Sequence, residues 1–282
     1  MGTAGIYSEI FASLASNQSL FPSLPEITIR LRATLNDPRC DIASAAKLLK
    51  TDPGLSAFIM RIANSVRYMS RFPPKDLEAA LRRIGLEAAS RLATTFAIRS
   101  SFETSNPVLK SMLVASYRNA TKVSVISYFL AERFSGFDPS KAMLAGLLQD
   151  IALPPILLRL SERPDVFEDA GKRLRAVDQL APLVGVLILK NWGFDDELIE
   201  VVRTRKDWMR DPYESADLSD IVIIARLHSM IGTSEFTDCP SFVQVPAFHK
   251  LPFGELTPGQ SIKMLEDAQD ELADIARLLG GG

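Results

Sequence analysis

The chain has 282 residues, of which 47% are hydrophobic and 23% charged, values typical of a globular protein with room for one large domain or two lobes. The net charge of −2 and the pI near 5.8 disfavour a nucleic-acid-binding protein, because such proteins carry an excess of basic residues. No uninterrupted run approaches the roughly 18 apolar residues of a membrane span, and the two distant cysteines, Cys40 and Cys239, fit a reducing cytosol, so we expect a cytoplasmic protein.

Helical periodicity dominates the N-terminal half. Asp52 and Pro53 mark a clear helix start, because an aspartate can cap free backbone amides and a proline needs no N–H in the first helical turn. The same device recurs at Asn106–Pro107, Asp138–Pro139 and Thr257–Pro258. The apolar residues that follow Asp52 at the spacing of one helical face, and that predict a buried core, are Leu55, Phe58, Ile59, Ile62 and Val66. Further helices are expected over residues 25–36, 41–50, 76–84 and 87–102.

The C-terminal half is also predicted to be helical. Helices are expected over residues 107–134, 181–191, 196–206 and 217–231. Only residues 242–245, between two prolines, alternate like a strand. A last amphipathic helix over residues 258–279 must either pack back on the body or meet a second copy of the chain. We therefore predict an all-α bundle with an N-terminal lobe (1–104), a C-terminal lobe (105–235) and an extension with one extra helix (236–282).

Four segments, in the same order, resemble the HDOD (HD-related output domain) family of bacterial signalling proteins. They are Phe21-Pro22-Ser23-Leu24-Pro25, the stretch from Asp52-Pro53-Gly54-Leu55 to Ala63-Asn64-Ser65, the stretch from Asp76 to Leu86, and Ala145-Gly146-Leu147-Leu148-Gln149-Asp150-Ile151. The resemblance implies a multi-helical fold related to that of the HD-domain metal-dependent phosphohydrolases. It also implies a regulatory role in signal transduction.

The metal ligands of the related hydrolases are largely missing from this chain. By the resemblance, their positions fall at Asn119, Gln149, Asp150, Ala181, Arg205 and Arg226. Only Asp150 retains a ligand of the expected type, and Gln149 stands where a histidine is usual. The chain has only two histidines, so it cannot build a centre with several imidazole ligands. Arg205 and Arg226 would repel a divalent cation, and we expect no metal and no cofactor.

Two interpretations of Arg205 and Arg226 remain open at this stage. They pair with Asp150 or another acid and stabilise the emptied pocket, which we favour, or they hold an anionic ligand such as a nucleotide phosphate.

Four polar or aromatic residues in the N-terminal half are candidates for a structural tie or an interaction surface. Asn64 and Tyr68 follow the Asp52 helix, and Arg82 and Arg83 lie in the third segment of the resemblance. For Asn64 a structural tie is favoured, whereas Arg82 and Arg83 are expected to form a solvated face that could also dock an acidic partner.

These observations leave two main hypotheses about function. The first is a non-catalytic signalling module, a pseudoenzyme that binds a partner protein or small ligand and that could form a homodimer. The alternative is a degenerate phosphohydrolase acting on a nucleotide or cyclic dinucleotide, with Mg²⁺ held by oxygen ligands around Asn119, Gln149 and Asp150. Metal analysis of the purified protein would separate the two.

Overall fold

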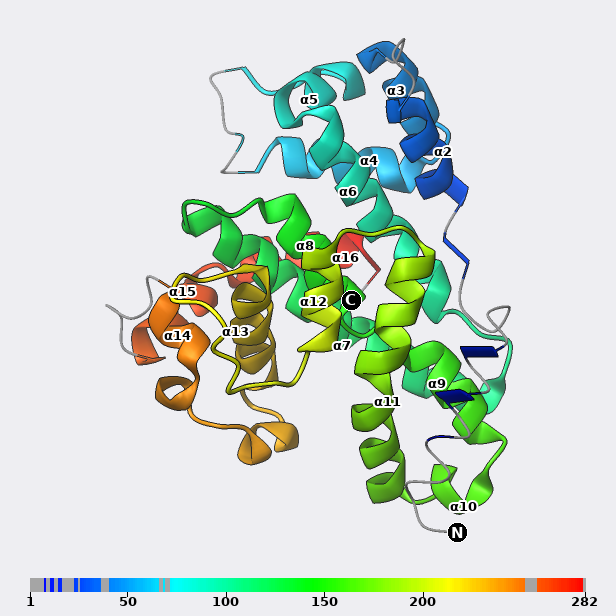
Figure 1. The fold of residues 1–282 in the computed structure, drawn as a ribbon. Helices are drawn as coiled ribbons and strands as arrows, with labels where there is room; N and C mark the ends of the chain where they lie inside the picture. Colours follow the sequence, from blue (N-terminus) through cyan, green and yellow to red (C-terminus); the bar gives the residue numbers. More distant parts are fainter. Residues whose placement is uncertain are drawn as a thin grey trace.

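The fold is all-helical, as the sequence predicts, with no strand among the residues that the structure describes. The computed structural model describes residues 26–36, 41–65, 72–251 and 258–280, together with positions 8, 11, 12, 15, 16, 23, 24 and 68. In chain order the helices of the first half are α2 (Glu26–Asn36), α3 (Ile42–Leu49), α4 (Pro53–Ala63), α5 (Leu77–Ile84), α6 (Leu86–Ala97), the 3₁₀ helix η3 (Ile98–Phe102) and α7 (Pro107–Arg133). Those of the second half are α8 (Pro139–Leu148), α9 (Leu153–Ser161), α10 (Pro164–Phe167), α11 (Ala170–Asn191), α12 (Asp196–Arg203), α13 (Leu218–Met230), η4 (Ser234–Asp238), η5 (Phe242–Gln244), α14 (Pro246–Lys250), α15 (Pro258–Asp267) and α16 (Gln269–Leu278). Figure 1 shows α2–α5 gathered at one end of the molecule, with α6 leading from them into the remaining helices.

The helix starts that the sequence marks are real caps. The Asp52 carboxylate accepts a hydrogen bond from the Leu55 amide at 3.0 Å, and Asp138 accepts from the Ser140 amide at 2.8 Å. Asn106 caps α7 in the same way. Each cap satisfies backbone amides that have no partner inside the helix, so these starts are fixed locally. The predicted cap Thr257 and the predicted core residue Val66 lie outside the described residues.

Two large hydrophobic clusters form the interior. One joins α2–α6 with Val125 and Tyr128 of α7, Met143 of α8, and the last helix, α16. Leu55, Phe58, Ile59 and Ile62 are all fully buried in it, which confirms the face predicted to point inward. The other joins η3 and α7–α14. Since α7 and α8 contribute to both clusters, they connect the two ends of the bundle.

A close approach of α7 and α8 lies at the centre of the fold. These two helices make the most extensive contact in the molecule. At Gly146 a side-chain carbon would lie 2.8 Å from the Ser124 Cα atom, closer than two such atoms can approach. Glycine is therefore required at this point of α8. The tight contact carries the end of α8, and the turn that follows it, into the interior.

The structure corrects three predictions in the C-terminal half. Residues 242–245, expected as a strand, form the short 3₁₀ helix η5, in which the Ser241 amide donates to the Gln244 side chain at 2.9 Å. The helix expected over 181–191 begins at Ala170 and runs through Pro182. The single helix expected over 258–279 is two helices, α15 and α16, which meet at Ala268.

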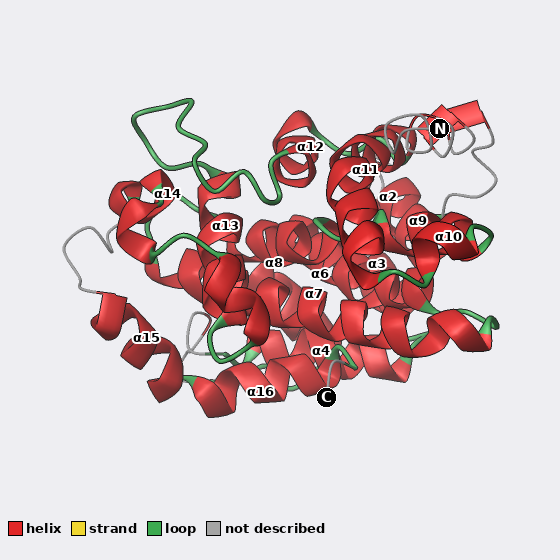
Figure 2. Cartoon of the chain, turned by 90° about the horizontal axis from the view of Figure 1, so that it is seen from below, coloured by secondary structure: helices red, strands yellow, loops and turns green. Residues whose placement is uncertain are grey.

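The last two helices pack back on the body. Ile275 and Leu279 are buried in the first cluster, the Tyr117 hydroxyl donates to the Leu279 carbonyl at 2.6 Å, and Asp274 of α16 pairs with Arg61 of α4. Figure 2 shows α15 and α16 as a bent arm along one side of the molecule.

The most apolar stretch of the described chain belongs to the core. Among the described residues, Pro139–Ser161, which contains α8 and α9, is the one segment with the length and composition of a membrane-crossing helix. It is not a continuous helix, and 78% of its most apolar window is buried inside the fold. Its hydrophobic character is therefore explained by its central position between other helices.

Candidate functional site

The candidate site forms at the turn between α8 and α9. Gln149 is the C-terminal cap of α8, and Asp150 follows it. Gln149 is fully buried and Asp150 is 4% exposed. The close packing of α8 on α7 thus places an amide and a carboxylate inside the protein, where each needs a partner.

Two arginines from other elements meet these side chains. Arg205, in the turn after α12, donates from Nη2 to Asp150 Oδ1. Arg226, in the middle of α13, donates from Nη1 to Gln149 Oε1 at 2.9 Å and lies 3.4 Å from both carboxylate oxygens of Asp150. Both arginines are buried. Together these four residues form what we term the Asp150 cluster.

A further carboxylate supports Arg205. Asp178 of α11 lies 3.7 Å from Arg205 Nη1 and accepts a hydrogen bond from Lys206 Nζ at 2.7 Å. Asp178 lies three residues before Ala181 and so on the same side of α11. The sequence analysis singled out Ala181, which is buried and apolar, and missed Asp178. Together with Asp178, the charged side chains of the Asp150 cluster therefore link α8, α11, α12 and α13.

The arginines hold Asp150 in its charged form. Burial by itself would raise the pKa of the Asp150 carboxyl, but the charges of Arg205 and Arg226 and the hydrogen bonds from them lower it to about 2. Burial lowers the pKa of Arg226, against the opposing effect of the Asp150 carboxylate. Arginine is so basic that it keeps its charge near neutral pH. The site therefore contains two cationic side chains, Arg205 and Arg226, beside the Asp150 carboxylate, and Asp178 lies at its edge.

These residues do not fit a divalent metal ion. A metal centre needs several neutral or anionic donors that converge on one point, and the described residues contain no group of three His, Cys, Asp or Glu side chains that could hold a metal ion. At Asp150, the one ligand-type side chain that the resemblance left, both approaches are taken by guanidinium groups. A dication placed there would face two fixed positive charges.

A small pocket opens beside the cluster. It has a volume of about 50 Å³, and Asn119, Asp150, Arg226, Ser229 and Thr233 line it. Asn119 therefore lines the same pocket as Asp150 and Arg226. The pocket volume is well below the range of about 300 to 1,000 Å³ that is usual for small-molecule sites. The small volume and the mutual pairing of the charged side chains favour the structural interpretation of the two arginines.

The other candidate residues do not join the Asp150 cluster: Asn64 and Tyr68 follow α4, and Arg82 and Arg83 lie on α5. The Asn64 amide donates to a backbone carbonyl in the last turn of α4 at 2.8 Å. Arg83 donates to two carbonyls, at the end of α4 and in the loop after it. Tyr68 packs against the core of the N-terminal helices. Arg82 points to solvent and lies 3.2 Å from Glu78. The Arg82 side chain is 62% exposed.

A second buried ion network, which the sequence analysis missed, lies at the start of α13. Arg210 donates two hydrogen bonds to Asp217, at 2.8 and 2.7 Å, and one to Asp220 at 2.6 Å. Lys250 of α14 lies 3.8 Å from Asp220. Burial and the Asp217 charge raise the pKa of Asp220, against the effect of Arg210 and Lys250. The network fastens the loop before α13, and also α14, to α13.

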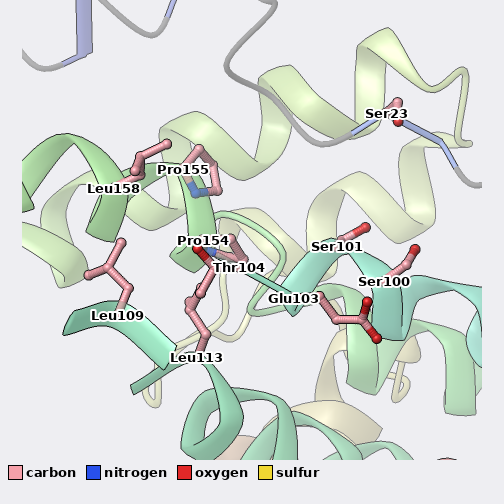
Figure 3. Close-up of a pocket in the computed structure, with 10 residues that line it drawn as sticks. All are labelled: Ser23, Ser100, Ser101, Glu103, Thr104, Leu109, Leu113, Pro154, Pro155 and Leu158. Carbon is pink, nitrogen blue, oxygen red and sulfur yellow. The ribbon is translucent and has the colours of Figure 1, made fainter. Parts of the chain in front are cut away.

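A third feature is a surface pocket of about 270 Å³ between η3, the start of α7 and α9. Figure 3 shows Ser100, Ser101 and Glu103 on one side of it and Leu109 and Leu158 on the other. None of its lining residues belongs to the Asp150 cluster. Glu103 lies 3.7 Å from Arg99 at the protein surface, and no convergent set of charges forms inside.

Comparisons with known proteins agree with this fold. A family model described as the HDOD domain matches residues 21–208. An HDOD domain protein of unknown function from Geobacter sulfurreducens is 20% identical, with a TM-score of 0.63 over 98% of this chain and 99% of that one. A candidate metal-dependent phosphohydrolase from Shewanella amazonensis SB2B is 23% identical, with a TM-score of 0.72 over 97% of each chain.

Two further relatives are more distant or longer. A candidate signal transduction protein from Marinobacter aquaeolei VT8 is 17% identical, with a TM-score of 0.56 over 93% of this chain and 59% of that one. An uncharacterized protein of Treponema pallidum is 18% identical over 234 residues, and the match spans 44% of its length. At these identities the solved structures share the fold with this chain, and the chemistry has to be argued from its own residues.

Proposed function

The chain belongs to the HDOD domain family, and on that premise we propose that it is a non-catalytic regulatory module of signal transduction whose former metal site has become a buried ion cluster. One observation carries the proposal. Asp150 is paired with Arg205 and lies 3.4 Å from Arg226, which also holds Gln149. The positive charge that a metal ion would supply at this position is supplied by two side chains of the protein.

The cluster also lacks the parts that phosphoryl hydrolysis needs. Metal-assisted hydrolysis requires a metal-bound water and room for the substrate phosphate beside it. Asp150 is shielded by the two arginines, and the adjoining pocket has a volume of about 50 Å³. A carboxyl group with a pKa of about 2 is also a weak base near neutral pH.

A regulatory module acts through what it binds. We propose a protein partner in a cytoplasmic bacterial signalling pathway, with nucleic acid disfavoured by the net charge of −2. The exposed Arg82 on α5 is the candidate contact, since its side chain is 62% exposed and its ion pair with Glu78 is of the weak surface type. Such a residue suits an acidic partner surface, and association into a homodimer is a second way in which the module could act.

The loss of catalysis is tested with the purified full chain. The protein is incubated with Mg²⁺, Mn²⁺, Fe²⁺ or Zn²⁺, desalted and analysed for metal content, and then assayed with p-nitrophenyl phosphate, bis-p-nitrophenyl phosphate and a cyclic dinucleotide. We expect no stoichiometric metal and no turnover above that of Asp150→Asn. Stoichiometric metal, or turnover that is abolished in a folded Asp150→Asn variant, would restore the alternative of a degenerate phosphohydrolase.

A restoring variant makes the same test sharper. Gln149→His with Arg226→Asp returns a histidine and an aspartate to two positions that the resemblance implies as ligands. We expect metal uptake to rise in this double variant relative to the unchanged chain, because one repelling cation is gone and two donors are gained. Equal uptake by both proteins would show that the arginine is not what keeps metal away.

The proposed binding of a partner protein is tested by reconstitution of the complex from purified components. A partner captured from the host is purified and titrated against the chain, and the affinity is compared for Arg82→Glu and for Arg277→Glu, an exposed arginine on α16 that serves as the matched control. We expect only Arg82→Glu to weaken the complex. Equal effects of the two variants on the affinity would show that α5 is not part of the interface.

A further inference from the structure

A second candidate pocket lies beneath the C-terminal arm, apart from the Asp150 cluster. Its volume is about 530 Å³, roughly ten times that of the pocket beside Asp150. It lies between α7, the end of α13, and the helices α15 and α16. This volume is within the range of about 300 to 1,000 Å³ that is usual for small-molecule sites.

The walls of this pocket are mainly aliphatic. Val125 and Ile126 of α7 form one side, Ile231 closes the end near α13, and Leu265 and Leu272 come from the arm. Val125 and Ile126 are buried, whereas Ile231, Leu265 and Leu272 are half-buried, so these side chains can cover an apolar chain from more than one direction. Each methylene removed from water there contributes favourably to binding.

The charged groups that line the pocket indicate which kind of head group a ligand would carry. Arg118 and Lys122, one helical turn apart on α7, both line it. Lys122 is committed to the protein, since its ammonium donates to the Ser229 carbonyl at 2.6 Å. Arg118 is exposed and makes no ion pair with any residue that the structure describes. Among the described residues of the lining, Glu266 on α15 is the one acidic side chain, so cations exceed anions there.

We propose that this pocket binds a single-chain amphiphile with an anionic head, with its aliphatic chain among the apolar side chains of α7 and the arm and its carboxylate beside Arg118. The site is separate from the Asp150 cluster, so the proposal stands whether or not the chain is catalytic. Because the bound chain would contact the body on one side and α15 and α16 on the other, the ligand would stabilise the arm in the position seen here.

The test uses calorimetric titration of the full chain with decanoate below its critical micelle concentration. Decanol and decyltrimethylammonium carry the same alkyl chain with a neutral and a cationic head. We expect decanoate to bind more tightly than either, and dodecanoate to bind roughly tenfold more tightly than decanoate, because two more methylenes are buried. Absence of decanoate binding, or equal binding of the three head groups, would overturn the proposal.

Three variants locate the site. Arg118→Gln should weaken decanoate by about two- to fivefold, as expected for a solvent-exposed ion pair, and leave decanol unchanged. Ala273→Phe, at an exposed alanine of α16 that lines the pocket, should abolish binding of both by filling the space while the circular dichroism spectrum stays that of the unchanged chain. Arg30→Gln, at an exposed arginine of α2 that does not line the pocket, is the matched control and should have no effect. Unchanged decanoate binding in a folded Ala273→Phe variant would place the ligand elsewhere and refute the assignment.

Discussion

Replacement of Asp150 by asparagine tests the ion cluster most directly, because it removes one charge while nearly keeping the shape of the side chain. In the folded protein the pKa of Asp150 is about 2, against 3.8 for an ordinary aspartate. At 1.36 kcal/mol per pKa unit this difference corresponds to about 2 kcal/mol of stability at neutral pH. Removal of one partner from a buried ion pair typically costs about 3–5 kcal/mol, because the remaining charge is left buried and unpaired. We therefore expect Asp150→Asn to lower the free energy of unfolding by about 2 to 5 kcal/mol at pH 7.

The contribution of Asp150 to stability should also depend on pH in a definite direction. The pKa of Asp150 is lower in the folded state than in the unfolded chain, so its charged form stabilises the fold at every pH above about 4. That contribution is lost as the pH falls from about 4 to about 2, where the folded carboxyl takes up its proton. The difference in stability between the unchanged chain and Asp150→Asn should therefore shrink over this interval.

Urea denaturation followed by far-UV circular dichroism, at pH 7 and at steps down to the lowest pH at which both chains unfold cooperatively, measures both effects. Asp165→Asn is the control, because Asp165 is exposed and lies 3.6 Å from Arg163, and this change should cost less than about 1 kcal/mol. Adding Arg226→Gln to Asp150→Asn should recover part of the loss, since it removes one of the buried cations left unpaired. A loss under about 1 kcal/mol for Asp150→Asn would refute the view that the cluster is a strongly coupled buried site.

Four further predictions concern the stability of the folded chain. Phe58 is fully buried, so Phe58→Ala should cost about 3–5 kcal/mol in urea denaturation, and a loss under about 1 kcal/mol would contradict the packing. Gly146→Ala brings a methyl group within 2.8 Å of the Ser124 Cα atom and should cost about 1–3 kcal/mol by forcing α7 and α8 apart, whereas an unchanged midpoint would mean that the helices separate freely. Burial lowers the pKa of His228 to about 4, so stability should rise with pH between about 4 and 6.5, and the slope should diminish in His228→Gln. EDTA should leave the urea midpoint unchanged, and a lowered midpoint would reveal a structural metal.

The sequence predicts most of the helices because their starts are local. The carboxylates of Asp41, Asp52, Asp138 and Asp195 accept hydrogen bonds from amides within three residues of themselves, so each cap can be recognised without knowledge of the rest of the fold. The inward face of α4 is also local, since the 3.6-residue period identifies it once the helix is assigned.

The errors occur where distant contacts decide the conformation. The charged first turns of α11 show little apolar periodicity, so the helix is expected to begin only at residue 181, but α11 continues through Pro182. The alternation at residues 242–245 indicated a strand, but no strand lies beside these residues in the part of the chain that the structure describes, and Phe242 packs against His228 of α13 and Phe248 of α14. The break at Ala268 interrupts no visible pattern, because it depends on where α15 and α16 meet the body.

The site shows the same division between local and distant information. Gln149 and Asp150 are visible as a motif, and the positions of Arg205 and Arg226 follow from the resemblance. The partners of Asp178 and Arg210 could not be found in the same way, because ion pairs join segments whose spacing in sequence is arbitrary. Of the two, the Arg210 network had a usable signal: Asp217 and Asp220 have the three-residue spacing of a capping box, and the structure contains that box.

Under the proposed loss of the metal site, the persistence of Asp150 has a physical explanation. A carboxylate buried at the end of α8 is strongly unfavourable unless positive charge lies beside it. A bound metal can supply that charge and join the helices that carry its ligands, but only while the metal is present. Arg205 and Arg226 supply the charge permanently, and with Asp178 they connect α8 to α11, α12 and α13. We propose that this exchange removes the open coordination position on which hydrolysis depends while keeping the helices together, and a regulatory domain would require only the second property.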